Sequence, residues 1–452
     1  MADRSNYRGP ARLVSAGITA AFVGAAVLAA SAPAVAAPGT PGIPSDPVVV
    51  YVETFEGAPD TGDRTLLTSL VGPTGIMYTA DPFWLDPSLC NGFAMSYSNA
   101  TRVSTDCTGS VGPDSAYASL RQLAHALGQI NGTDPATNSV SAAFTHAAVE
   151  PADNLVEFEM LSAYPMSGAN KFLQFSVNAA AVNCWAPDQP SFRFYQKHAD
   201  DTETAVSSVA INPCTDPRSS VYVVPNVGGF PYPYFAGAYT SDTVFLSGGE
   251  DIRFLMRNEQ SGLFGNDAAF DDIKIIDVSP QLDKSFADTT LAYGDVTRLT
   301  FTVTNTSELG AKVGWSFSDN LPTGMVVAPV PNTSTNCTNG VVVAVAGSNT
   351  IDVSGDLLDG EVSCTAEVDV RMPLASSSAN PSGLLANCAG NISDVVGLNL
   401  PACATVQLPP AITAIAATGA PISPVGAMAA VVALILGGLL VARAQRKTRP
   451  RN

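Results

Sequence analysis

Few residues in this sequence have the types and spacing that enzyme chemistry requires. The three histidines, His125, His146 and His198, are far apart in the chain, and none has the His-Glu-x-x-His spacing that places two imidazoles on one helix face. Glu157 and Glu159 share one side of a predicted strand, where two carboxylates could act as acid and base on a glycoside. Because apolar residues alternate with them, a solvated strand face is the simpler interpretation. The sequence therefore predicts a protein that is not an enzyme.

Carboxylates at the two ends of the first predicted domain are candidates for a structural calcium site. Calcium takes about six to eight oxygen ligands, and Glu53 or Glu56 could meet Asp271 and Asp272 if the first and last strands pair. Consecutive strand residues face opposite ways, so only one of the two aspartates can point into a shared site. We expect Asp272, on the face of Phe270. The alternative is that these acids are solvated strand ends.

Aromatic residues outside regular alternation are candidates for ligand contact: Trp84, Trp185, Tyr232, Tyr234 and Phe235. The last three lie in "GGFPYPYFAGAY", where glycine and proline indicate a loop that cannot bury all its rings. Such rings can stack on sugars or contact a protein partner. They can equally cover the open end of a sandwich.

All eight cysteines lie between the two apolar ends of the chain: Cys90, Cys107, Cys184, Cys214, Cys337, Cys364, Cys388 and Cys403. No pair has metal-ligand spacing, and an even number in an exported segment predicts disulfides. Four cysteines in each half allow three pairings per half. We favour neighbours in sequence order, because these close short loops.

Both ends of the chain carry targeting signals. Three arginines precede an apolar stretch over residues 13–30, and Ala34-Val35-Ala36 fits a signal peptidase site, so residues 1–36 are predicted to be a signal peptide. Residues 425–442 are apolar throughout and just long enough to span a membrane as a helix. The basic tail, 443–452, would stay in the cytoplasm. The region between is therefore expected to be exported through the secretion machinery.

The exported region is predicted to be all-β and to contain two domains. A Pro/Gly-rich leader over residues 37–47 precedes a first β-sandwich over 48–278, a second sandwich covers 279–408, and a linker covers 409–424. Apolar residues alternate along many short segments, as in half-buried antiparallel strands. One helix is expected over residues 115–129, with Asp114 capping its first amides.

The charge of the chain excludes one class of partner. Its formal net charge is −18, and the central part is more acidic still because basic residues concentrate at the two ends. Such a surface repels nucleic acid and anionic lipid. We therefore expect no nucleic-acid partner, and membrane contact only through the C-terminal helix.

The C-terminal segment resembles a known export signal. The order of Ile415-Ala416-Ala417-Thr418-Gly419, apolar span and basic tail resembles the cell-wall sorting signal of Gram-positive surface proteins, in the Leu-Ala-x-Thr-Gly variant of actinobacteria. Ile415 stands where that pattern prefers leucine. The resemblance implies that a sortase cuts between Thr418 and Gly419 and joins Thr418 to peptidoglycan. The alternative is a single-span membrane protein that keeps its helix.

Two further resemblances concern the domains. "LDKSF", "GDVTRLTFTVTN" and "FSDNLPTGM" resemble the Ig-like conserved-repeat domains of bacterial surface proteins, which implies a stalk. "YVETFEGAP" and "GNDAAFDDIKIIDV" are similar to the terminal strands of jelly-roll carbohydrate-binding modules, which pair with each other and often hold calcium. The expected role is adhesion through a glycan or protein ligand. The alternative is a structural envelope protein with no specific ligand.

A covalent lysine–asparagine link, known in some wall-anchored sandwich domains, is not predicted for the second domain. Lys284 lies in its first strand, and Asn387 or Asn391 lies near its end. The sequence identifies no buried acid that would assist the reaction, and two disulfides are already expected to restrain the fold.

Overall fold

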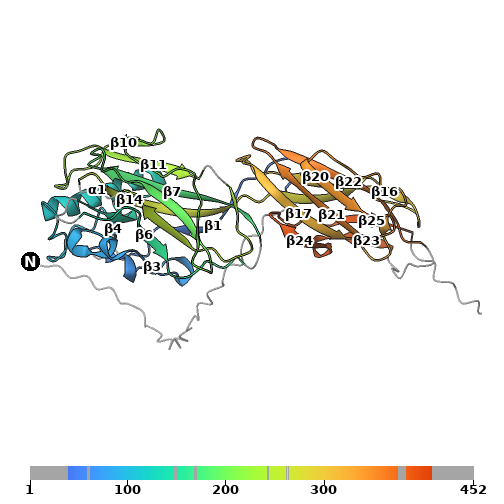
Figure 1. Cartoon of the computed structure of the whole chain (residues 1–452), viewed down its shortest axis with the longest axis horizontal. Helices are drawn as coiled ribbons and strands as arrows, with labels where there is room; N and C mark the ends of the chain where they lie inside the picture. Colours follow the sequence, from blue (N-terminus) through green and yellow to red (C-terminus); the bar gives the residue numbers. More distant parts are fainter. Residues whose placement is uncertain are drawn as a thin grey trace, which may run out of the picture. The chain divides into compact units, whose positions relative to one another are not determined.

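The computed structural model describes residues 39–58, 62–145, 150–166, 170–241, 244–260, 262, 264–374 and 383–409. Within these residues the protein is all-β with a single α-helix, and its strands form two sandwich-like groups. Figure 1 shows the first group in blue to yellow-green and the second in yellow to red. The all-β class predicted from the alternation of apolar residues is therefore confirmed.

The larger sheet of the first sandwich runs in the order β10-β11-β7-β14-β5-β4-β2, with β1 also paired to β14 and β12 to β7. Its strands are β1 (Val48–Glu53), β2 (Thr65–Leu66), β4 (Phe93–Ser96), β5 (Ser139–Ala143), β7 (Phe172–Val182), β10 (Ser220–Tyr222), β11 (Tyr234–Thr240), β12 (Phe245–Leu246) and β14 (Asp267–Asp277). β1 and β14 are antiparallel, so the expected pairing of the first and last strands is present.

The smaller sheet of the first sandwich runs in the order β3-β6-β13-β8-β9. Its strands are β3 (Tyr78–Thr79), β6 (Leu155–Met160), β8 (Phe192–Lys197), β9 (Glu203–Ala205) and β13 (Phe254–Asn258). Alternate residues of the two sheets form a common core, in which the rings of Phe55, Phe158 and Phe270 meet edge to face. Short 3-10 helices cover the margins: Leu67–Ser69, Pro73–Gly75, Pro82–Leu85 and Pro87–Leu89.

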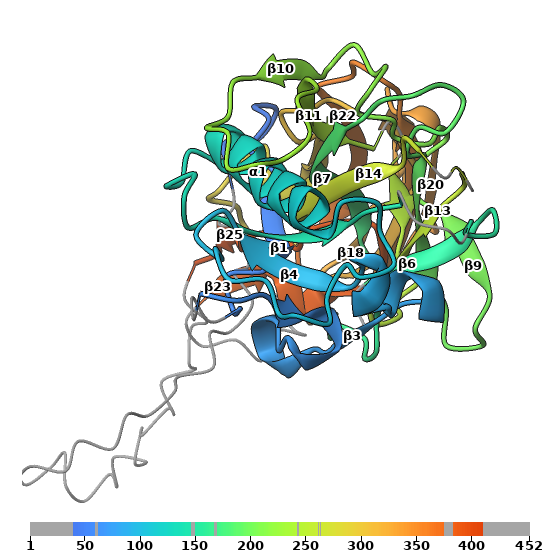
Figure 2. The same ribbon diagram turned by 90° about the vertical axis from the view of Figure 1, so that its left-hand side faces the viewer.

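Helix α1 (Pro113–Asn131) covers the other face of the larger sheet, where it packs on β5, β7, β11 and β14 (Figure 2). Its apolar face, which includes Leu120, Leu123 and Leu127, is fully buried, as its sequence period predicts. The predicted cap is wrong. Gly112 occupies the N-cap with a positive φ and no side-chain cap, and Asp114 instead pairs with Arg102.

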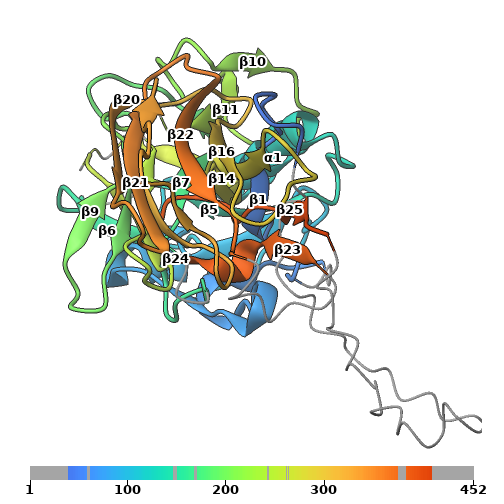
Figure 3. The same ribbon diagram turned by 90° about the vertical axis from the view of Figure 1, so that its right-hand side faces the viewer.

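The second sandwich consists of two larger sheets and a two-stranded sheet (Figure 3). The first sheet contains β15 (Gln281–Phe286), β16 (Val296–Thr304), β18 (Val326–Val327), β19 (Ser334–Thr335) and β22 (Ser363–Arg371). The second contains β17 (Lys312–Asn320), β20 (Thr338–Ala344), β21 (Thr350–Leu357) and β24 (Ile392–Val396), and β23 (Leu384–Asn387) pairs with β25 (Ala404–Gln407). A 3-10 helix, Ala389–Asn391, precedes β24. Trp315, Phe317 and Phe301 fill the core, as their alternation predicts.

The eight cysteines form four disulfides, each between neighbours in sequence order: Cys90–Cys107, Cys184–Cys214, Cys337–Cys364 and Cys388–Cys403. This is the arrangement that short loop closure favours.

The predicted terminal signals lie outside the described residues. These are the signal peptide (1–36), the sorting motif (415–419), the membrane helix (425–442) and the basic tail (443–452). In the part of the chain that the structure describes, no helix is both long and apolar enough to cross a membrane.

Candidate functional site

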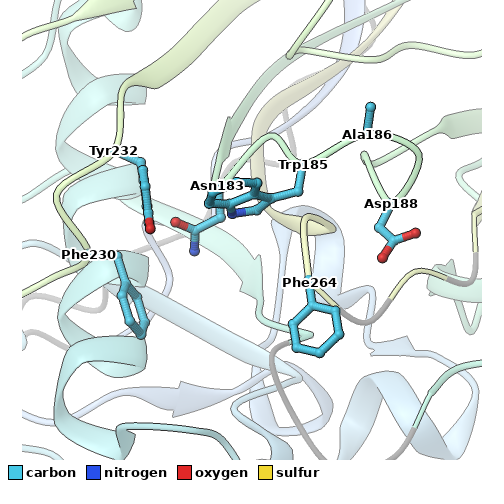
Figure 4. Close-up of a pocket in the computed structure, with 7 residues that line it drawn as sticks. All are labelled: Asn183, Trp185, Ala186, Asp188, Phe230, Tyr232 and Phe264. Carbon is cyan, nitrogen blue, oxygen red and sulfur yellow. The ribbon is translucent and has the colours of Figure 1, made fainter.

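A groove of about 420 Å³ opens at the surface of the first sandwich (Figure 4). It lies among three loops that precede or follow strands β7, β11 and β14. The residues that line it are Asn183, Trp185, Ala186, Asp188, Phe230, Tyr232 and Phe264. Four of these side chains are aromatic, so the groove offers ring surfaces to a ligand.

The rings stand open to solvent. Trp185 is 52% exposed, Tyr232 39% and Phe264 51%. The indole and phenol rings meet edge to face, with centroids 5.3 Å apart and planes at 81°. Large aromatic surfaces left in water are unfavourable unless something covers them. Their grouping around one groove is therefore typical of a binding site.

The loop that carries Trp185 is held by covalent and steric contacts. The disulfide Cys184–Cys214 ties it to a second loop. Gly265 lies against its backbone: a Cβ added there would lie 2.7 Å from the Trp185 carbonyl oxygen. Only glycine permits this close approach. The groove thus depends on backbone packing as well as on its rings.

One polar side chain at the base of the groove has an unused acceptor. Asn183 is buried and donates through Nδ2 to Asp267 Oδ2 at 2.7 Å. Its Oδ1 has no hydrogen-bond partner among the described residues. Burial raises the pKa of Asp267 to about 6, although the amide of Thr145 also donates to this carboxylate. A ligand hydroxyl could satisfy the free acceptor, since a buried polar atom without a partner is costly.

The predicted aromatic candidates divide into two groups. Trp185 and Tyr232 line the groove, whereas Trp84 and Tyr234 are buried at 1% and 3% exposure and cannot contact a ligand. The prediction failed for these two because Trp84 lies in a 3-10 helix folded over the core, and Tyr234 begins strand β11 instead of lying in a loop. Phe235 is half-buried in the same strand, outside the groove lining.

Five lining residues were not predicted, of which Ala186 offers only a methyl group. Phe230 follows Gly229, and Phe264 precedes Gly265. An aromatic residue beside glycine in a predicted loop is a signal that could have identified both. Asn183 and Asp188 had no such signal, because their role depends on which loops meet in space.

Glu53 does not lie in the arrangement expected for a calcium site. Its carboxylate is buried and accepts hydrogen bonds from the Tyr78 hydroxyl and from the amide of Phe55 at 2.6 Å. Burial raises its pKa, and Tyr51 extends the cluster through a 2.9 Å contact between the two tyrosine hydroxyls. The Glu53 carboxylate therefore links the core to strand β3, and the groups that donate hydrogen bonds to it belong to the protein itself.

The other three acids of the calcium prediction lie near one another with separate partners. Glu56 accepts from the Ser139 amide, Asp271 accepts from the amides of Asn131 and Asn138, and Asp272 pairs with Lys274 at 2.8 Å. Asp271, not the favoured Asp272, is the buried one, since strand β14 has a bulge at this point. Among the described residues no group of three or more acidic, histidine or cysteine side chains is arranged to hold a metal. Calcium binding stays a prediction.

The paired glutamates of strand β6 do not form a solvated face. Glu157 is buried, accepts from Asn258 Nδ2 at 2.9 Å, and has its pKa raised to about 8 by burial. Glu159 is half-buried and pairs with Lys197 at 3.0 Å and with Arg253. The pairing of β6 with β13 is irregular at Glu157, which has no partner in the register, and period-two alternation does not predict such a bulge.

Comparison with known proteins gives a family match over part of the chain. Residues 280–408 match a family model described as a domain of unknown function, DUF7933. These residues form the second sandwich. A search of curated proteins finds no match.

Solved structures show weak similarity. An N-terminal domain of a Streptococcus gordonii adhesin shares 7% identity, with 52% of this chain and 57% of that structure covered and a TM-score of 0.27. A putative membrane-anchored protein of Corynebacterium diphtheriae shares 7% over 60% and 92% of the two chains, with a TM-score of 0.20. The major pilin subunit of Bacillus cereus shares 12% over 50% and 69%, with a TM-score of 0.19. Scores this low do not establish a shared fold or function.

Proposed function

We propose that this chain is an exported, non-enzymatic bacterial surface protein, in which a jelly-roll-like first sandwich binds a ligand and an Ig-like second sandwich acts as a spacer. In this proposal signal peptidase removes residues 1–36. A sortase then cuts between Thr418 and Gly419 and joins Thr418 to peptidoglycan. The C-terminal helix would hold the chain in the membrane only until that step.

The aromatic groove is the observation that supports a binding role. Trp185 and Tyr232 offer ring faces, and the free Oδ1 of Asn183 and the carboxylate of Asp188 offer hydrogen-bond acceptors. A pyranose ring has an apolar face that can stack on such rings and hydroxyls that can donate to such acceptors. We therefore favour a glycan over a protein ligand.

Binding of residues 37–408 to a glycan array is the direct test. The expected result is saturable binding to a subset of glycans, with affinity reduced about tenfold or more by Trp185→Ala or Tyr232→Ala, because each removes a stacking surface. Val223→Ala is the control, since this side chain is 89% exposed and does not line the groove.

The competing proposal is a structural envelope protein with no specific ligand. It predicts no saturable binding by the folded protein and no difference between the groove variants and the control. A ligand bound equally well by all three variants would also exclude the groove as the site.

Anchoring needs a separate measurement. Protein released from purified walls by a muralytic enzyme should end at Thr418 and carry a peptidoglycan fragment. A chain that ends at Asn452 and fractionates with the membrane would instead show a permanent membrane anchor.

A further inference from the structure

Three polar side chains from distant parts of the second sandwich meet inside its core. Lys284 comes from β15, Asp319 from β17 and Asn387 from β23. The side chains of Lys284 and Asp319 have no exposed surface, and Asn387 is 0% exposed. A lysine and an aspartate are rarely buried so completely unless they are paired, as these two are at 3.3 Å.

The three side chains contact one another in a closed set. Lys284 Nζ lies 2.6 Å from Asn387 Oδ1 and 3.3 Å from Asp319 Oδ1. Asn387 Nδ2 donates to Asp319 Oδ2 at 2.7 Å. The amine therefore lies against the asparagine carboxamide, and the carboxyl group contacts both the amine and the amide nitrogen.

Burial makes the neutral forms of the pair more favourable. Desolvation lowers the pKa of Lys284 and raises that of Asp319, and the attraction between their charges only partly opposes this. Both shifts favour transfer of a proton from the ammonium to the carboxylate. An uncharged amine is a nucleophile, whereas an ammonium is not.

We propose that Lys284 and Asn387 react with each other to form an intramolecular amide, with Asp319 as the proton carrier. Lys284 Nζ attacks Asn387 Cγ, and its surplus proton passes through Asp319 to the amide nitrogen. The Cγ–Nδ2 bond then breaks and ammonia leaves. One C–N bond forms and one breaks, Asp319 ends as it began, and no outside reactant is needed. Exclusion of water protects the amine and the product from competing reactions.

The structure distinguishes Asn387 from its neighbour Asn391. The side chain of Asn391 accepts from the Cys388 amide at 2.9 Å and donates to the Asn320 carbonyl at 2.7 Å, so it caps a turn. Asn387 is held at the amine by strand β23 and by the disulfide that begins at the next residue, Cys388. The carbonyl of Cys388 also accepts from Lys284 Nζ at 3.1 Å.

A second buried lysine shows what the reaction requires. Lys312 also has no exposed side-chain surface, but its amine contacts Glu308 and the Gly310 carbonyl at 2.9 Å. Those contacts contain a carboxylate and a backbone carbonyl, with no side-chain amide. Burial of a lysine alone therefore does not provide an acceptor for amide formation, and Lys312 should stay unmodified.

Intact mass and peptide mapping of the exported protein test the proposal. After reduction, the mass should be about 17 Da, the mass of one ammonia, below that calculated for the processed chain. Trypsin should not cut after Lys284, and a branched peptide should join the segments that contain Lys284 and Asn387. The peptide map is essential because cyclisation at Asn-Gly sequences, such as Asn91-Gly92, also releases ammonia.

Three variants complete the test. Asn387→Ala and Asp319→Asn should each restore the full mass, while Asn391→Ala should keep the loss of ammonia. Full mass in the wild-type protein with normal cleavage after Lys284, a link between other residues, or a mass loss that survives Asn387→Ala would each overturn the proposal. The wild-type peptide map decides the matter even if a variant fails to fold.

Discussion

Glu157 links the protonation of one side chain to the stability of the first sandwich. Burial raises its pKa from 4.5 to about 8, so between these values the folded state binds a proton that the unfolded state releases. Stability conferred by this group is complete below about pH 4.5 and falls as pH rises to 8. Glu157→Gln should remove this pH-dependent contribution. The free energy of unfolding of the variant, minus that of wild type, should therefore rise by up to about 1.4 kcal/mol per pH unit between pH 4.5 and about 8.

Urea unfolding of wild type and Glu157→Gln at several pH values between 5 and 8 measures this effect. Other buried acids, such as Asp267, contribute equally to both proteins and cancel in the difference. A difference that does not change with pH would show that Glu157 is ionised in the folded protein.

Gly265 tests whether the groove depends on close backbone packing. A Cβ at this position would lie 2.7 to 2.9 Å from backbone atoms of Trp185 and Asn183, which cannot move aside as a flexible side chain can. Gly265→Ala should destabilise the first sandwich by about 1–3 kcal/mol and weaken ligand binding. Gly390→Ala is the matched control, because open space surrounds that position. Equal stability of the two variants would contradict the argument.

At the scale of elements, alternation in the sequence predicted the strands better than the candidate site. In β16, Leu299, Phe301 and Val303 form the core as expected, because side chains of one sheet face repeat every second residue. Groove residues depend instead on which loops meet in space. Trp185 and Tyr232 are 47 residues apart in the chain, and only the fold brings their rings together.

The disulfide Cys184–Cys214 should stabilise the first sandwich and its groove, and it should have little effect on the second sandwich. It closes a loop of 30 residues, for which loss of the link costs about 3–4 kcal/mol in the chain-entropy model. Replacing both cysteines by serine should lower the unfolding temperature of the first sandwich and weaken binding. Replacing Cys337 and Cys364 is the control, and it should affect the second sandwich while binding persists. Loss of ligand binding in both variants would contradict the idea that Cys184–Cys214 stabilises the groove locally.

For the whole molecule, the buried group of Lys284, Asp319 and Asn387 shows a limit of sequence interpretation. Lys284 and Asn387 are 103 residues apart. Asp319 follows Trp315 and Phe317 at period two on the buried face of β17, but the alternation does not show which side chains it meets. The three meet because β15, β17 and β23 pack around one core. The side-chain contacts within the folded core identify the acid and select Asn387 over Asn391.

In the proposed role of a spacer, the second sandwich would gain resistance to load from a covalent link between distant strands. Because the amide would close a loop of 103 residues, Asn387→Ala should destabilise the second sandwich by up to about 5 kcal/mol. Hydrogen exchange measured during thermal unfolding can follow each sandwich separately. The expected result is earlier exchange in β15 and β23 of the variant, with the first sandwich unchanged. Unchanged exchange in the second sandwich would show that its disulfides alone set its stability, and parallel loss in both sandwiches would show that the two unfold as one unit.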